Sequence, residues 1–299
     1  MPKILIVCTQ AYRLSISGMH QKNTSCAWSP DSRFLITVDK NIVCVWNLET
    51  RTCIKSHEKL VVDVKDHGHP VAWSPRGDLI ALADPKVGIV LLETEFFTIK
   101  SVLKHKKCVS VSWSKNGEYL ASAGYDKIVK IWNPRTEEEL ALIRHDSKVF
   151  DVVFHPDRDI IASGYKDGIR VFDINGGIIQ EITSQQSIKN IAWRDATHIV
   201  FATDAKNFGV VDFEIYSVEW QKLQEEPIYS IDLKDKVIAM GCGDGIVKIV
   251  DASNGNPLRI YQVLKKNIVC VRFNPKGDLI AVCNNKGEVR VIAYSEQPQ

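Results

Sequence analysis

Three histidines close together in the sequence are the first residues that could do chemistry. His57, His67 and His69 lie near Asp66, and imidazoles at two-residue spacing can share a metal ion. The alternative is a solvated connection between structural elements that happens to be rich in histidine. We favour the connection, and we predict no metal ion and no cofactor for this chain.

Two further patterns imitate functional motifs. Gly241, Gly243 and Gly245 form a G-x-G-x-G string, but a phosphate-binding loop needs a strand that leads into a helix. Here the string joins two predicted strands, which indicates a tight turn. Glu137 to Glu139 are consecutive carboxylates, whereas acid–base catalysis needs carboxylates in different environments. Because no Ser-His-Asp or Cys-His set is recognisable either, we predict that the protein is not an enzyme.

The cysteines carry no zinc signature. None of them forms a C-x-x-C pair, and most lie inside runs of β-branched residues. Without a secretory signal, buried reduced thiols are expected rather than disulfides. We therefore expect the protein in the cytoplasm or nucleus. The eight cysteines are Cys8, Cys26, Cys44, Cys53, Cys108, Cys242, Cys270 and Cys283.

The elements that position these residues follow from composition and length. The chain has 299 residues, 45% hydrophobic and 25% charged, which is typical of a soluble globular protein and excludes a disordered chain. The net charge of +2 argues neither for nor against a nucleic-acid partner. The first apolar run, Ile4 to Cys8, is far shorter than the roughly 18 residues that span a bilayer, so we expect no membrane insertion.

A repeat of about 40 residues runs through the chain. Each repeat has a β-branched run that ends in a large apolar anchor, then a turn rich in Gly, Pro, Asn and Asp, and then two or three more short apolar runs. The seven anchors are Trp28, Trp73, Trp113, Phe154, Trp193, Leu233 and Phe273. No segment shows a sustained helical period.

Each repeat thus predicts a four-stranded antiparallel sheet that must pack against its neighbours to bury both faces. The prediction is all-β: one seven-bladed β-propeller domain over residues 1–299. The seventh unit ends after Val289 to Tyr294, so a strand near Tyr12 to Ser17 should complete it and remove the exposed edge. The expected blades are 24–58, 69–105, 108–146, 149–183, 188–224, 227–263, and 268–294 with 11–17.

The repeats resemble the WD-repeat family of β-propellers, over essentially the whole chain. The clearest unit contains Val111-Ser-Trp-Ser, then Leu120-Ala-Ser-Ala-Gly-Tyr-Asp, then Val129-Lys-Ile-Trp. The resemblance implies a buried, hydrogen-bonded tetrad of His105, Ser122, Asp126 and Trp132. Other units depart from the pattern, with Phe172, Leu92, Val211, Val250 or Ile292 in place of the tryptophan. No subfamily is assignable.

The resemblance also implies a shared face for the loops between second and third strands and for the connections between blades. Basic residues outnumber acidic ones in these segments, so a nearly neutral chain can carry one basic face. The alternative is that these lysines only keep the protein soluble. The partner-binding candidates on this face are Lys104, Lys106, Lys107, Lys127, Lys148 and Lys166, together with the aromatic residues Tyr125, Phe150 and Tyr229.

These observations predict a non-enzymatic scaffold that binds other proteins as a subunit of a multi-protein complex, itself a monomeric propeller. Its partners would be acidic or phosphorylated proteins. One alternative is RNA or polyanion binding through the basic face. Another is a substrate-receptor subunit of a cullin-type ubiquitin ligase, because Trp132-Asn-Pro-Arg resembles the Trp-Asp-x-Arg motif of such receptors. A metal-dependent propeller hydrolase is disfavoured, since innermost positions such as Val109 and Val269 are apolar.

Overall fold

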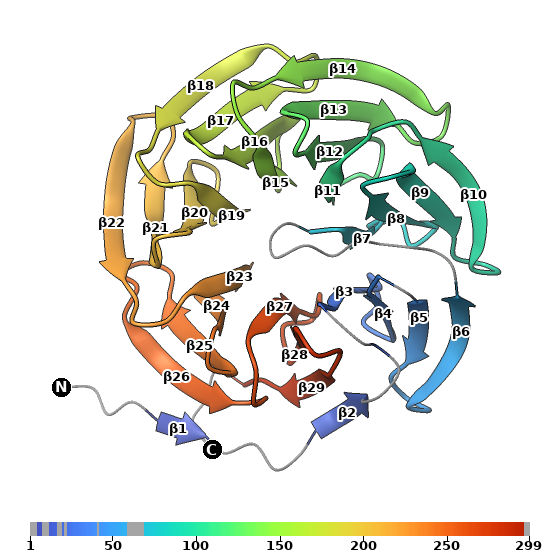
Figure 1. The fold of residues 1–299 in the computed structure, drawn as a ribbon. Helices are drawn as coiled ribbons and strands as arrows, with labels where there is room; N and C mark the ends of the chain where they lie inside the picture. The colour runs from blue at the N-terminus through green and yellow to red at the C-terminus, as the bar shows by residue number, and fades with distance from the viewer. Residues whose placement is uncertain are drawn as a thin grey trace. The chain divides into compact units, whose positions relative to one another are not determined.

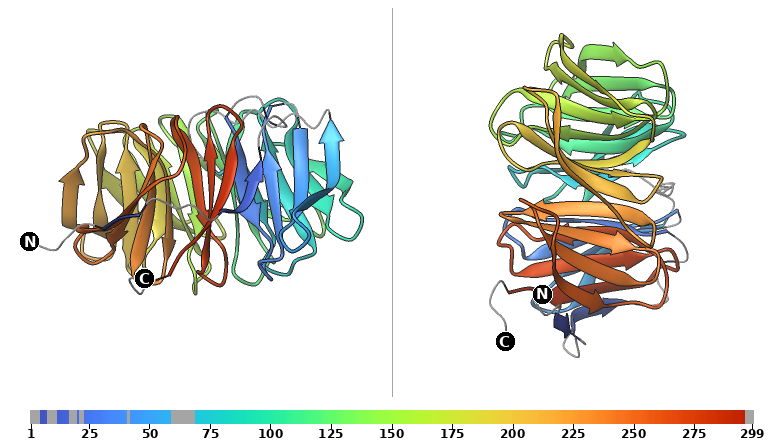
Figure 2. Two further views of the ribbon diagram at one scale, coloured as in Figure 1. Left: turned by 90° about the horizontal axis from the view of Figure 1, so that it is seen from below. Right: turned by 90° about the vertical axis from the view of Figure 1, so that its left-hand side faces the viewer.

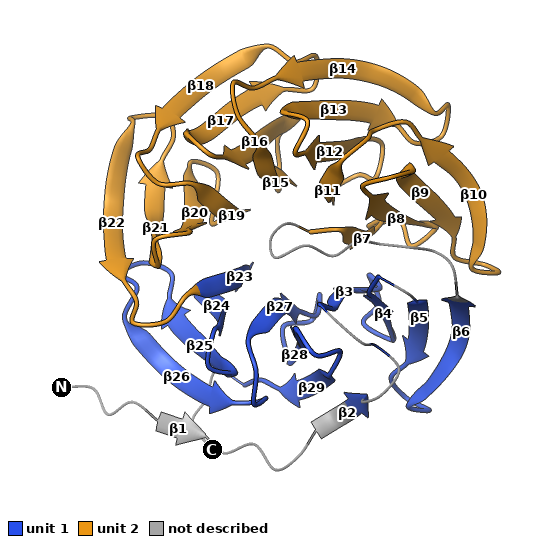
Figure 3. Cartoon of the chain, in the orientation of Figure 1, with its two compact units in different colours: residues 1–66, 228–299 blue, residues 67–227 orange. Residues whose placement is uncertain are grey.

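The computed structural model describes residues 5–7, 12–16, 20, 23–40, 42–58 and 69–295. In this part of the chain every regular element is a β-strand, and the strands form seven sheets (Figure 1). The chain divides into two compact units, residues 67–227 and residues 1–66 with 228–299 (Figure 3). Each sheet is one blade, numbered here in chain order, and Figure 2 shows the twist of the individual blades.

The unit of residues 67–227 contains blades 2 to 5. Each is an antiparallel sheet whose strands pair in chain order. Blade 2 has β7 Val71–Trp73, β8 Leu79–Asp84, β9 Gly88–Glu93 and β10 Thr98–Leu103; blade 3 has β11 Cys108–Trp113, β12 Leu120–Gly124, β13 Ile128–Asn133 and β14 Glu138–Arg144; blade 4 has β15 Val149–Phe154, β16 Ile160–Tyr165, β17 Gly168–Asp173 and β18 Ile178–Thr183; blade 5 has β19 Ile188–Trp193, β20 His198–Thr203, β21 Asn207–Asp212 and β22 Ser217–Leu223.

The other unit contains blades 6, 7 and 1. Blade 6 has β23 Ile228–Lys234, β24 Val237–Cys242, β25 Ile246–Asp251 and β26 Pro257–Gln262; blade 7 has β27 Ile268–Phe273, β28 Leu279–Asn284, β29 Val289–Ala293 and β2 Tyr12–Ile16; blade 1 has β3 Ser25–Trp28, β4 Phe34–Val38, β5 Ile42–Asn47 and β6 Thr52–Glu58. The sequence left residues 3–8 unplaced; in the structure β1, Leu5–Val7, adds to β26 as a parallel fifth strand.

The N-terminal strand completes the last blade, as predicted. β2 runs antiparallel to β29, with Leu14 opposite Val291 and Ile16 opposite Val289. The final sheet therefore combines strands from both ends of the sequence. The fold class is confirmed: a seven-bladed propeller of four-stranded antiparallel blades with an N-terminal closing strand. A single domain over residues 1–299 stays a prediction.

The 40-residue period has a structural cause. An anchor residue lies at or next to the last position of each innermost strand, and three anchor tryptophans contact the blade before them. Trp113 Nε1 donates to the Ala72 carbonyl at 3.1 Å, and Trp193 Nε1 donates to the Val153 carbonyl at 3.3 Å. In the other unit Trp28 Nε1 donates to the Arg272 carbonyl at 3.0 Å. In these three repeats one tryptophan therefore both packs its ring and joins its blade to the blade before it.

In the described sheets no further strand pairs with the inner edge of an innermost strand. Side chains join neighbouring innermost strands there. Ser110 Oγ accepts from the Val152 amide at 3.3 Å, and Asp151 Oδ2 accepts from the Ile191 amide at 3.0 Å. In blade 6, Ser230 Oγ accepts from the Val271 amide at 3.2 Å. The third residue of an innermost strand thus satisfies the next blade's backbone.

In the described part of the chain no helix has the length and apolar character needed to cross a bilayer.

Candidate partner-binding site

The four residues of the expected tetrad lie in one hydrogen-bonded group in blade 3. His105 Nδ1 is 2.7 Å from Ser122 Oγ, and Trp132 Nε1 donates to the same oxygen at 2.8 Å. His105 Nε2 is 3.4 Å from Asp126 Oδ1. His105, Ser122 and Trp132 are buried, whereas Asp126 is partly exposed. The group fixes the loop after β12, which carries Tyr125 and Lys127.

Other blades keep parts of this group. In blade 1, Thr37 Oγ1 takes the place of the serine hydroxyl: it lies 2.8 Å from His20 Nε2 and accepts from Trp46 Nε1 at 2.8 Å. In blade 4, His145 Nε2 is 2.9 Å from Ser163 Oγ, and the Phe172 ring occupies the tryptophan position. The histidines expected at these positions are therefore structural residues.

The candidate lysines lie along one edge of the unit of residues 67–227. Backbone hydrogen bonds join each loop between second and third strands to an adjacent connection: Tyr125 N to Lys107 O at 3.0 Å, His145 N to Lys127 O at 2.8 Å, and Lys166 N to Lys148 O at 3.1 Å. The side chains of all six candidate lysines are exposed, including those of Lys104 and Lys106. The six candidate lysines extend over blades 2 to 4 and present a row of cations.

Four residues on this edge form a group that we call the basic–aromatic cluster: Tyr125, Lys148, Phe150 and Lys189. The Tyr125 and Phe150 rings meet edge to face with centroids 5.7 Å apart. Lys148 Nζ lies 5.6 Å from the Tyr125 centroid, and Lys189 Nζ lies 3.4 Å from the Phe150 centroid. These are cation–π distances, so each ring holds one ammonium group in place.

The ammonium group of Lys189 is less favourable in this setting than in water. Burial lowers the pKa of Lys189, the positive charge of Lys148 lowers it further, and Asp204 raises it. The Asp204 carboxylate lies 3.9 Å from Lys189 Nζ. An anion that binds beside Lys148 and Lys189 would relieve this repulsion.

The sequence-based candidates have different surroundings in the structure. The expectation is that at least one of the three aromatic candidates is accessible to solvent. Phe150 is only 7% exposed, so it supports the cluster from beneath. Tyr125 and Tyr229 are partly exposed. Tyr229 belongs to the other unit, in β23, where its hydroxyl accepts from Asn267 Nδ2 at 3.1 Å. Lys189 was not among the selected candidates, although a lysine at the second position of an innermost strand was a usable signal.

Two lysines on this edge also have a backbone role. Lys127 and Lys206 have φ of 69° and 65°, where Gly245 and Gly287 have 83° and 82° at the corresponding turns. A non-glycine residue in this region is strained by about 1–2 kcal/mol. Lys127 Nζ donates to the Asp146 carbonyl at 2.9 Å, so this side chain secures the neighbouring connection as well as adding charge.

A serine, a histidine and an aspartate meet at the inner end of blade 4, but not in a catalytic order. Ser110 Oγ donates to Asp151 Oδ1 at 2.8 Å, and His69 Nδ1 lies 3.4 Å from the same oxygen. A nucleophilic serine needs the histidine, not the carboxylate, as its base. Asp151 is fully buried, so this group is a structural link. The three histidines that were considered as a metal site and interpreted as a connection, His57, His67 and His69, lie partly outside the described residues.

Three thiols that are scattered in the sequence meet where blades 7 and 1 pack. The sulfur atoms of Cys26, Cys270 and Cys283 lie within 4.8 Å of one another, and all three residues are buried. Hydrogen bonds from Cys26 and Cys283 hold the pKa of Cys270 below its ordinary value. Structural zinc takes four ligands, so the three donors that meet within the described residues form an incomplete set. The other cysteines in the described residues are free thiols too, as expected.

Comparison with known proteins finds WD repeats in this chain. A family model described as "WD domain, G-beta repeat" matches residues 15–47, 97–133 and 137–173. The chain is 24% identical to COMPASS component SWD3 of Saccharomyces cerevisiae, over 83% of this chain and 71% of that protein. It is 24% identical to THO complex subunit 3 of Arabidopsis thaliana, over 60% of each chain.

Two further likenesses cover nearly the whole chain. One is to a periodic tryptophan protein 2 homolog of Caenorhabditis elegans, 26% identical over 98% of this chain but only 34% of that protein. The other is to the solved structure of U3-55K, with a TM-score of 0.84, 16% identity, and coverage of 94% of this chain and 98% of that chain. The expected resemblance to the WD-repeat family of β-propeller proteins is confirmed, and no subfamily is assigned.

Proposed function

We propose that this protein is a non-enzymatic scaffold that binds other proteins as a subunit of a multi-protein complex. Its WD-repeat relatives include proteins named as a COMPASS component and as a THO complex subunit. WD-repeat propellers are in general interaction platforms rather than enzymes. The Ser110, His69 and Asp151 group fits this view, because its hydrogen bonds serve packing. A nuclear location is part of the proposal, and imaging of the tagged full chain tests it.

The observation that carries the proposal is the basic–aromatic cluster beside the row of exposed lysines. The positive charge of Lys148 contributes to the lowered pKa of Lys189, and a carboxylate or phosphate group bound between the two would neutralise both charges. The favoured ligand is therefore an acidic or phosphorylated segment of a partner protein. Single-stranded RNA is disfavoured, because such sites stack several bases on exposed aromatic rings and Phe150 is buried.

The ubiquitin-ligase alternative has a weaker basis in the structure. Asn133 replaces the aspartate of the receptor motif, and its Oδ1 accepts from the backbone amides of Arg135 and Thr136 at 3.0 and 3.3 Å. A turn between β13 and β14 explains this residue fully. We therefore give no receptor role to the segment.

The test is charge reversal on the basic edge. Lys104, Lys106, Lys107 and Lys148 are changed to Glu in one variant, and the exposed Lys276 is changed to Glu in a control variant. Proteins that co-purify with the tagged wild-type chain are identified by quantitative mass spectrometry. One purified partner is then titrated calorimetrically against each variant between 50 and 300 mM salt.

We expect the fourfold variant to bind at least 10-fold more weakly, and the wild-type affinity to fall as salt rises. The control variant should bind like wild type. Equal affinity of the fourfold variant, or an affinity independent of salt, would contradict the proposed site. A partner fraction that disappears on RNase treatment would favour RNA instead.

A further inference from the structure

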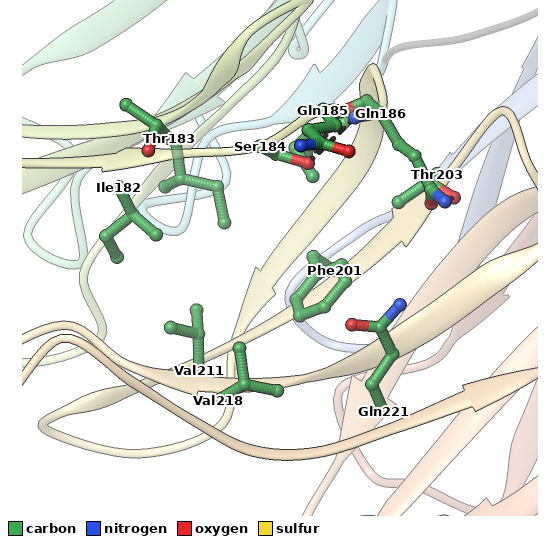
Figure 4. Close-up of a pocket in the computed structure, with 12 residues that line it drawn as sticks. Ile182, Thr183, Ser184, Gln185, Gln186, Phe201, Thr203, Val211, Val218 and Gln221 are labelled. Atoms are coloured by element: carbon green, nitrogen blue, oxygen red, sulfur yellow. Dashed lines mark hydrogen bonds between the residues drawn. The ribbon is translucent and has the colours of Figure 1, made fainter.

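A cavity of about 230 Å³ lies between blades 4 and 5 (Figure 4). Phe201 from β20 stands in its centre, Ile182 from β18 lies on one side, and Val211 and Val218 from β21 and β22 lie below. Gln185 and Gln221 contribute to its edge. All of these residues belong to the unit of residues 67–227, and none belongs to the basic–aromatic cluster.

The cavity lies where blade 5 has lost its tetrad. In blade 3, the tetrad serine Ser122 pairs with the third residue of β13, and the tetrad tryptophan Trp132 is the fifth residue of β13. In blade 5, the residue that pairs with the third residue of β21 is Phe201, and the fifth residue of β21 is Val211. Ser184 takes the histidine position, because its amide bonds to the Asp167 carbonyl as that of His145 bonds to the Lys127 carbonyl. Blade 5 thus has Val211 at the tryptophan position and Ser184 at the histidine position. These two side chains are smaller than a tryptophan and a histidine, and the ring of Phe201 fills only part of the space.

The ring of Phe201 is seated by Gly209. A Cβ at Gly209 would come within 2.4 Å of the Trp220 carbonyl and 3.1 Å of the Phe201 ring, so the glycine lets the ring lie against β21. Phe201 is only 7% exposed and forms a fixed floor. The cavity is therefore a built feature of blade 5 with a rigid apolar base.

The cavity edge is polar but uncharged. Among the described residues that line it, none carries a formal charge. Gln186 is already engaged, because its Oε1 accepts from Thr203 Oγ1 at 2.9 Å and from Asn207 Nδ2 at 2.8 Å. Gln185 and Gln221 are exposed at the edge, and each primary amide can donate to and accept from a peptide group. A charged ligand would lose its hydration here without gaining a counter-ion.

The volume sets the size of the ligand. A cavity of about 150 Å³ holds one benzene molecule, whereas sites for drug-sized ligands measure about 300–1,000 Å³. A cavity of about 230 Å³ therefore suits one aromatic side chain and excludes a nucleotide. Apolar surface continues past the opening on β22, where Val218 is 54% exposed and Leu223 is 71% exposed.

We propose that this cavity is a docking site for a partner protein, which inserts one uncharged aromatic side chain from an extended, uncharged segment. The ring would lie on Phe201 between Ile182 and Val218. The amide groups of Gln185 and Gln221 would bond to the partner's backbone on either side of the ring. The site is separate from the basic–aromatic cluster, and it would bind an apolar partner segment, whereas the cluster would bind an anionic one.

The test uses a random 12-residue peptide library displayed on phage, selected against the full-length chain. Selected peptides are synthesised, and their affinity is measured by fluorescence anisotropy. Val218→Arg places a guanidinium at the cavity opening. Ile215→Arg is the matched control, because Ile215 is 69% exposed next to the same strand but does not line the cavity. Thermal melting of both variants checks that they fold.

We expect selected peptides to share one aromatic residue with uncharged neighbours. Replacing that residue with Ala, or introducing Val218→Arg, should weaken binding at least 10-fold. Ile215→Arg and the fourfold lysine variant should leave the affinity within about 2-fold of wild type, which separates this site from the proposed basic site. Failure to enrich any peptide, an acidic consensus, or unchanged binding to a folded Val218→Arg variant would overturn the proposal.

Discussion

Replacing Asp151 with Ala should destabilise the protein more than a typical single substitution. The Asp151 carboxylate is fully buried in the innermost strand of blade 4. It accepts from Ser110 Oγ at 2.8 Å, from the Val152 amide at 3.0 Å and from the Ile191 amide at 3.0 Å, and His69 Nδ1 lies 3.4 Å away. One side chain thus links blades 2, 3, 4 and 5.

The magnitude follows from the donors left behind. The Val152 amide keeps Ser110 Oγ as a second acceptor at 3.3 Å, but the Ile191 amide and the Ser110 hydroxyl lose the acceptor they have here. Each buried donor without a partner costs about 1–3 kcal/mol, so the free energy of unfolding should fall by about 2–6 kcal/mol. Total stability is typically about 5–15 kcal/mol, so this loss is large.

The assay is urea unfolding followed by tryptophan fluorescence and by circular dichroism. Asp151→Asn should lower the free energy of unfolding by about half as much as Asp151→Ala. The asparagine side chain keeps one acceptor oxygen, but its NH2 group faces the Ile191 amide, which is also a donor. Asp146→Ala is the surface control, since the Asp146 side chain is 94% exposed. A loss below about 1 kcal/mol for Asp151→Ala, with an unchanged denaturant slope, would refute this reasoning.

Three further predictions test other parts of the fold. Burial lowers the pKa of His145 to about 4 from 6.5, so between pH 4 and 6.5 the unfolded chain binds more protons than the folded protein, and stability falls as the pH falls. The difference in unfolding free energy between wild type and His145→Gln should therefore narrow by roughly 3 kcal/mol from pH 6.5 to pH 4. A difference that stays constant over this range would contradict the prediction. Deleting residues 1–17 removes β2 and uncovers the edge of β29, so light scattering should show aggregation; a soluble variant with an unchanged melting temperature would argue against the closing role. Trp113→Phe removes the indole donor to the Ala72 carbonyl of the preceding blade and should lower the free energy of unfolding in urea by about 1 kcal/mol. Trp73→Phe should lower it less, because the Trp73 indole donates to the Gly77 carbonyl of its own turn at the longer distance of 3.4 Å.

Much of the fold could be predicted because its signals are local and repeated. An anchor such as Trp113 or Trp193, a Gly-, Pro- or Asn-containing turn, and alternating β-branched residues recur every 40 residues, and each repeat folds into one blade. The missing fourth strand after Val289 was also visible as a gap in the pattern, and β2 fills it. The tetrad residues of blade 3 could be selected because that unit matches the family pattern closely.

The candidate site depended on contacts that sequence position does not encode. The sequence made Phe150 one of three aromatic candidates without telling which of them is exposed, and packing against Tyr125 and Lys189 buries it. Lys189 was not selected as a candidate, and the structure places its ammonium group 3.4 Å from the centroid of the Phe150 ring. Alternation along a strand tells which face a side chain takes, but not which neighbour from another blade covers it.

The sequence by itself determined the number of blades, their strands and the closing strand, because short-range turn chemistry and strand alternation specify each of them. Only the tertiary structure decided what meets between blades. It brought Cys26 within 3.7 Å of Cys270, 244 residues away, made Asp151 a link between four blades, and opened a cavity where blade 5 replaces a tryptophan with Val211. These features depend on the shapes of side chains from separate repeats, and a period in the sequence carries no information about how such shapes fit.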